Sequence, residues 1–231
     1  MCIRDRHDDT DDYSYIEGSF VCADFAEMLH NNAEVFGIRA AWVGVDFIEG
    51  EGHALNAFNT TDKGLVYVDC TRGFSSPLTS ELGDDDEGRA CEHDKIAYLV
   101  EGKEYGSISI DKATASEYES YEGYQQKWAE LEKDIEAYNS DVEAYNSDVK
   151  AYEEDVEAYE RAVGGRKSIS DPEEYARLNK WYNELRAKES EMESRGNELN
   201  ARHEQLKERQ EELGFYHWAS LGVITGVEVY W

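Results

Sequence analysis

Hydrophobic and polar positions divide the chain into two parts with different periodicities. In residues 13–115, short β-type apolar runs lie between Gly, Asp and Asn breaks, and residues 23–36 carry apolar side chains at helical spacing. This helical stretch ends at Gly37, a residue that commonly follows the last turn of a helix. The β-type runs are residues 40–47, 54–59, 65–68 and 96–100. We therefore predict an α+β domain for this part of the chain.

Residues 116–213 are predicted to form two long helices. Residues 132–163 repeat the pattern E-A-Y-x-x-D-V, and the heptad register continues over six heptads. The a positions are Tyr121, Trp128, Ile135, Val142, Val149, Val156 and Val163, and the d positions are Tyr124, Leu131, Tyr138, Tyr145, Tyr152 and Tyr159. Two glycines at 164–165 interrupt the first helix, and Asp171-Pro172 then supplies an N-cap and a first-turn proline for the second.

An antiparallel hairpin about the 164–170 loop places the a positions of one helix against the d positions of the other. The d positions of the second helix are Leu178, Leu185, Met192, Leu199, Leu206 and Leu213. The predicted register sets Tyr138 against Gly196 and Tyr145 against Glu189, so that these tyrosines have a small or a polar neighbour. We predict an intramolecular coiled-coil hairpin over residues 116–213.

The two ends of the chain are expected to differ in their roles. Residues 214–231 are typical of a turn and a final β-strand, which is not stable alone and is expected to join the sheet of residues 13–115. The hairpin is then an insertion in one domain. Residues 1–12 are expected to be disordered, and their opening MCIRDR resembles a translated sequencing adapter, in which case Cys2 is not native.

Charge excludes two classes of partner. The chain has 52 Asp and Glu against 23 Lys and Arg, a net charge of −29, which repels phosphate backbones and anionic membrane surfaces. No window in the given residues approaches the uninterrupted apolar length of a membrane-spanning helix, so we expect neither nucleic-acid binding nor membrane insertion. The sequence indicates no compartment and no oligomeric state.

Three side chains are candidates for a catalytic triad. Cys22 comes just before the predicted helix, where unpaired backbone N–H groups and the helix dipole lower the pKa of a thiol. His53 opens one β-type run and Asp69 closes the next, so an antiparallel pair of strands brings imidazole and carboxylate together. Nucleophile, base and orienting carboxylate are the parts that a Cys-His-Asp triad needs.

Several segments together resemble the transglutaminase-like, papain-related superfamily. They are FVCADFAEMLH from Phe20, GIRAAWV from Gly37, GHALNAF from Gly52 and VYVDCT from Val66. The resemblance covers about residues 13–75 and implies a papain-like core, in which a helix bearing the Cys packs on an antiparallel sheet. It implies that Cys22 is the nucleophile, His53 the general base and Asp69 the residue that orients His53.

We therefore expect a cysteine-nucleophile acyl-transfer enzyme, in the first place a peptide or isopeptide hydrolase, with a protein or peptide substrate. No cofactor or metal is expected, since the spacing of Cys70, Cys91 and His93 supplies no paired zinc motif, and a solvated loop is the favoured interpretation of acidic residues 84–87. A metal site there and a Cys70–Cys91 disulfide are the less favoured alternatives.

The hairpin is expected to recognise a protein partner. The alternative is a non-catalytic scaffold, in which the core only anchors the coiled-coil arm. A third hypothesis is self-association through the arm. Accessibility of Cys22 and its distance from His53 separate the enzyme from the scaffold.

Overall fold

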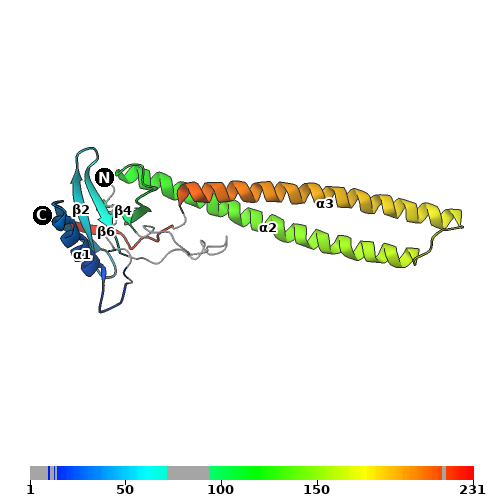
Figure 1. The fold of residues 1–231 in the computed structure, drawn as a ribbon, viewed down its shortest axis with the longest axis horizontal. Coiled ribbons are helices and arrows are strands. Elements are labelled where there is room, and N and C mark those ends of the chain that lie inside the picture. The colour runs from blue at the N-terminus through cyan, green and yellow to red at the C-terminus, as the bar shows by residue number, and fades with distance from the viewer. Residues whose placement is uncertain (1–9, 11–12, 14, 72–93, 215–216) are drawn as a thin grey trace. The chain divides into compact units, whose positions relative to one another are not determined.

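The computed structural model describes residues 10, 13, 15–71, 94–214 and 217–231 (Figure 1). The chain divides into two compact units, residues 1–128 with 211–231 and residues 129–210. Residues 1–9, 11–12, 14, 72–93 and 215–216 are outside the description. Thr10, in the segment expected to be disordered, is buried and its hydroxyl oxygen accepts a hydrogen bond from Asn32 Nδ2 at 3.3 Å.

The first unit is α+β, as the sequence predicts. Helix α1 (Cys22–Val35) precedes a six-stranded sheet with the order β5-β4-β3-β2-β1-β6, in which every neighbouring pair is antiparallel. The strands are β1 (Ala40–Phe47), β2 (His53–Thr60), β3 (Gly64–Asp69), β4 (Lys95–Tyr98), β5 (Gly106–Ser109) and β6 (Ile224–Tyr230). The C-terminal strand β6 pairs with β1, so residues on both sides of the hairpin contribute to one sheet.

Helix α1 packs on one face of this sheet. Its buried side chains are Phe25, Ala26, Leu29 and Ala33. The buried amide of Asn56 in β2 donates to the carbonyl oxygens of Ala26 at 2.9 Å and of Ala41 at 3.3 Å, which ties the helix to two strands. Because buried amides without partners are costly, these bonds fix how α1 lies over β1 and β2.

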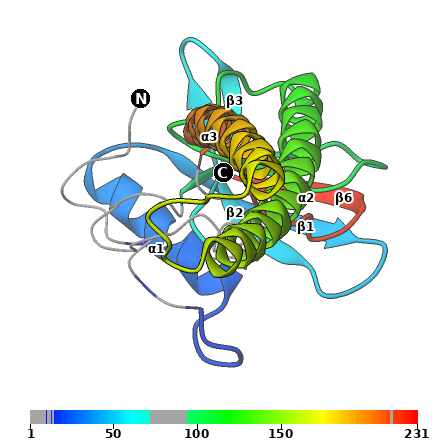
Figure 2. The ribbon, with the colours of Figure 1, turned by 90° about the vertical axis from the view of Figure 1, so that its right-hand side faces the viewer.

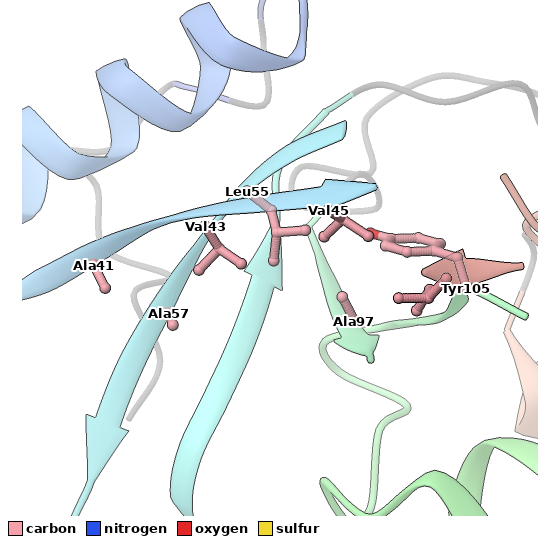
Figure 3. Packing of buried hydrophobic residues seen from close by; sticks show 8 residues of the cluster. Ala41, Val43, Val45, Leu55, Ala57, Ala97 and Tyr105 are labelled. Carbon is pink, nitrogen blue, oxygen red and sulfur yellow. The ribbon is translucent and has the colours of Figure 1, made fainter. Parts of the chain in front are cut away.

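The opposite face carries the main apolar cluster. Figure 3 shows its side chains extending from the strands on the side away from α1. The buried members are Ala41, Val43, Val45, Leu55, Ala57, Ala97, Tyr105 and Ile224. Because side chains alternate between faces along a strand, His53 shares this face with Leu55 and Ala57. The imidazole is therefore held at the end of an apolar surface.

The second unit is a helical hairpin. Helices α2 (Tyr118–Val163) and α3 (Pro172–Leu213) contribute residues 129–210 to it, and they lie side by side in both views (Figures 1 and 2). Gly164 and Gly165 end the first helix with φ of 60° and 68°, a region that favours glycine. Asp171 Oδ1 accepts the Glu173 N–H at 2.9 Å, so the predicted N-cap is confirmed.

The predicted hairpin register is wrong by one heptad. The Tyr145 hydroxyl lies 3.0 Å from the position of a Cβ built on Gly196, where the prediction had Glu189. The ring of Tyr138 lies 5.8 Å from that of His203, where the prediction had Gly196. The direction of the hairpin was predicted, but not the axial position of one helix against the other.

Ion pairs explain this register. Four pairs at heptad intervals have N–O distances of 2.6 Å: Asp134–Arg209, Asp141–Arg202, Asp148–Arg195 and Asp155–Lys188. The predicted register keeps only three Asp-to-base pairs, sets Asp155 against Trp181 and sets Arg209 against Lys127. Each exposed pair contributes only about 0.2–1 kcal/mol, which is enough to choose between heptad registers with similar apolar cores.

Candidate active site

Cys22 is the first residue of α1. The preceding residue, Val21, has extended backbone, and its N–H donates to Asp24 Oδ2 at 2.7 Å, which fixes the start of the helix. Cys22 is half-buried, and its sulfur forms no disulfide. A thiol at this position faces the positive end of the helix dipole and the free amides of the first turn.

His53 and Asp69 come together across two neighbouring strands. His53 is the first residue of β2, Asp69 is the last of β3, and these strands are antiparallel. His53 Nε2 donates to Asp69 Oδ2 at 3.1 Å, with the two side chains 9% and 3% exposed. The predicted contact between imidazole and carboxylate is therefore present.

The thiol of Cys22 lies close enough to the same imidazole for the two groups to interact. Since Asp69 engages His53 Nε2, the other ring nitrogen, Nδ1, is left available to the sulfur. Burial opposes ionisation of Cys22, but His53 and the backbone N–H groups of Ala54 and Ala23 stabilise the thiolate and lower the pKa of this cysteine. The structure thus brings all three predicted residues into one chain of contacts.

The carboxylate keeps His53 protonated. Burial alone lowers the pKa of a histidine, but the Asp69 charge and hydrogen bond, with the contribution of Cys22, raise the pKa of His53 to about 9. Burial likewise acts against the charge of Asp69, yet Lys95 and His53 hold the pKa of its carboxyl well below the usual range. The arrangement therefore stabilises a thiolate on Cys22 beside an imidazolium on His53.

Two residues of the site were missed in the sequence. The Tyr105 hydroxyl donates to Asp69 Oδ2 at 2.6 Å, and Lys95 Nζ lies 3.5 Å from the same oxygen. Lys95 opens an apolar run and Tyr105 precedes β5, so neither belongs to a recognisable motif. A lysine at the start of an apolar strand run was the only signal available.

The remaining candidate groups do not form a second site in the described part of the chain. Cys70 is buried, whereas Cys91, His93 and the acidic residues 84–87 lie outside the described residues. Among the described residues, no three His, Cys, Asp or Glu side chains gather in a way that could hold a metal ion. None of the described helices has an apolar stretch long enough for a membrane crossing.

Comparison with protein-family models, curated proteins and solved structures gave no significant match. The geometry of the site is therefore the basis for assigning a function.

Proposed function

We propose that the chain is a cysteine-nucleophile acyl-transfer enzyme of the transglutaminase-like type, acting in the first place as a peptide or isopeptide hydrolase. The observation that carries this proposal is the chain of contacts from the Cys22 thiol through His53 to Asp69. Nucleophile, base and orienting carboxylate come from α1, β2 and β3 in the order and position that a thiol-imidazole-carboxylate triad requires. The half-burial of Cys22 leaves part of this residue open to solvent, which a scaffold with a fully buried thiol lacks.

The first half of the reaction forms a thioester. The Cys22 thiolate attacks the carbonyl carbon of an amide, and the developing oxyanion is held by backbone N–H groups. The Cys22 N–H is the first backbone amide of α1, a position that has no acceptor four residues earlier within the helix. As the C–N bond breaks, His53 gives its proton to the leaving amine, and the acyl group stays on the sulfur.

The second half releases the acyl group. Water, or an amine, attacks the thioester carbonyl, and His53 takes up a proton from this attacking nucleophile. The C–S bond then breaks, which returns Cys22 to the thiolate. Water gives a carboxylic acid and an amine gives a new amide, so the same residues support hydrolysis and transfer. Asp69 keeps the His53 ring in place throughout, and it balances the positive charge of the imidazole whenever the ring is protonated.

The helical hairpin is assigned to partner recognition. Its core positions are occupied by the tyrosine and leucine packing within the hairpin, while Tyr175 and Tyr182 of α3 are 57% and 45% exposed. Exposed aromatic side chains on a rigid helix are frequent anchors of protein interfaces. This surface favours a protein partner for the arm.

Peptide cleavage tests the proposal. The full chain is incubated with unfolded, lysine-rich and arginine-rich polypeptides, and the products are identified by mass spectrometry, with and without a primary amine as acyl acceptor. We expect new cleavage products with the wild-type chain, none with Cys22→Ala, and amine-capped products if transfer competes with hydrolysis. Identical products from the wild-type chain and Cys22→Ala contradict the proposal, provided circular dichroism shows that the variant is folded.

A further inference from the structure

The carboxylate of Asp69 binds more donors than a triad needs. Its Oδ1 accepts the Thr71 N–H at 2.9 Å. Its Oδ2 accepts hydrogen bonds from His53 Nε2 at 3.1 Å and from the Tyr105 hydroxyl at 2.6 Å. The same oxygen forms an ion pair with the Lys95 ammonium group at 3.5 Å. His53 therefore competes for one oxygen with a neutral donor and with a full positive charge.

Lys95 and Tyr105 are themselves held in place. The Lys95 side chain is 4% exposed, its ammonium group donates to the Thr71 carbonyl oxygen, and it lies 4.5 Å from the centre of the Trp218 ring. Tyr105 is 2% exposed, and its ring meets those of His53 and Phe47 edge to face at 5.5 Å and 6.0 Å. Buried groups with this many partners cannot easily turn away from the carboxylate.

We propose that Lys95 and Tyr105 are positioning residues that share the charge of the Asp69 carboxylate with His53 and thereby set how firmly His53 holds its proton. This inference rests on the proposed function, since it concerns the base of the same reaction. Among the described contacts, neither residue has a hydrogen bond to Cys22, and the Lys95 ammonium group and the Tyr105 hydroxyl both reach His53 through Asp69.

The physical reason is a conflict between burial and catalysis. A buried carboxylate paired only with an imidazole stabilises the imidazolium strongly, because the charges attract in a medium of low dielectric constant. An imidazolium held too firmly cannot give its proton to the leaving amine, and a base works best when its pKa lies near the working pH. Lys95 and Tyr105 also interact with the Asp69 carboxylate, and they thereby weaken its stabilisation of the His53 imidazolium.

The charged and titratable groups around His53 come from all the neighbouring elements. Among the described residues they are Cys22 of α1, Asp69 of β3, Lys95 of β4 and Tyr105 beside β5, with Tyr15 interacting with Cys22 from the segment before the helix. Burial and Asp69 raise the pKa of Tyr105 well above its ordinary value, so its hydroxyl stays a donor at every working pH. Lys95 is therefore the charged group that moderates the Asp69–His53 pair.

The test is the pKa of His53, measured by NMR titration of the histidine side chains in the full chain. All samples carry Cys22→Ser, which removes the coupled titration of the thiol, and His53→Asn assigns the resonance. Lys95→Met is expected to raise the pKa of His53 by about one unit, because a positive charge near the carboxylate is lost. Tyr105→Phe, which keeps the ring packing and removes only the hydroxyl, is expected to raise it by less.

Tyr98→Phe is the matched control. It removes another buried hydroxyl, which donates to the Ala115 carbonyl oxygen at 2.8 Å and does not touch Asp69, so the pKa of His53 is expected to stay at the Cys22→Ser value. An unchanged or lower pKa in both Lys95→Met and Tyr105→Phe overturns the proposal. If Lys95→Met does not fold, Tyr105→Phe alone decides. Because this measurement uses no substrate, its outcome is independent of whether peptide cleavage is found.

Discussion

At about pH 6.5, replacing His53 with Asn is expected to slow the alkylation of Cys22 by iodoacetamide by about 10- to 100-fold. The thiolate is the reacting species, and an ordinary thiol is only about 1% ionised at that pH. In the native chain His53 lowers the pKa of Cys22, so the thiolate is present below the ordinary range. A thiolate with a lower pKa is also a weaker nucleophile, which offsets part of the gain in rate from the larger ionised fraction. The expected factor therefore spans a decade.

The interaction between Cys22 and His53 also determines how the alkylation rate changes with pH. The wild-type rate is expected to rise at lower pH than for a free thiol, and to change again near pH 9, where His53 loses its proton. The rate for His53→Asn is expected to rise only toward the range of an ordinary thiol. Alkylation is followed by mass spectrometry of the Cys22 peptide over a pH series.

His30→Asn is the matched control for this experiment. It removes a histidine from α1, whose Nδ1 donates to the Ala40 carbonyl oxygen at 2.9 Å, without touching Cys22. Its alkylation profile is expected to equal that of the wild-type chain. Equal profiles for His53→Asn and the wild-type chain, or equal losses in both variants, contradict a thiolate held by His53.

Asp69→Asn is expected to reduce acyl transfer on the order of 10³-fold. The amide still fills the site but carries no charge, so the imidazolium loses the group that holds its pKa near 9 and its ring loses a defined orientation. Turnover of p-nitrophenyl acetate, an activated ester that reports on nucleophilic acyl transfer, gives the rate for the variant and the wild-type chain.

The same substitution leaves the buried ammonium group of Lys95 without its counter-charge. An unpaired buried charge costs about 3–5 kcal/mol of unfolding free energy, so Asp69→Asn alone mixes a loss of stability with a loss of chemistry. The double variant Asp69→Asn with Lys95→Met removes both charges and is expected to recover much of the stability in urea unfolding without recovering turnover. Recovery of turnover together with stability contradicts a catalytic role for Asp69.

The triad could be proposed from the sequence because each member stands at the end of an element. The helix start places Cys22, and an antiparallel strand pair places His53 opposite the end of the strand that carries Asp69. These are local relations that alternation and helix periodicity reveal. The catalytic roles of the three residues stay a proposal.

Lys95 and Tyr105 could not be found in the same way. Both reach Asp69 because β4 lies beside β3 and β5 lies beside β4, and this strand order is not encoded in the spacing of apolar residues. The hairpin register was missed for a related reason. A heptad pattern repeats every seven residues, so shifts by one heptad preserve the apolar core, and the pairing of Asp155 with Lys188 decides between them.

The claim that Cys22 is the nucleophile is tested most directly by trapping its acyl form. The full chain is mixed with p-nitrophenyl acetate near neutral pH, release of p-nitrophenolate is followed in the first turnover, and the acid-quenched protein is mapped by mass spectrometry. We expect a burst of about one equivalent, an acetyl thioester on Cys22, and loss of both in His53→Asn but not in His30→Asn. A native chain that carries no acetyl group on Cys22, or one that is acetylated there equally fast without His53, contradicts the assignment.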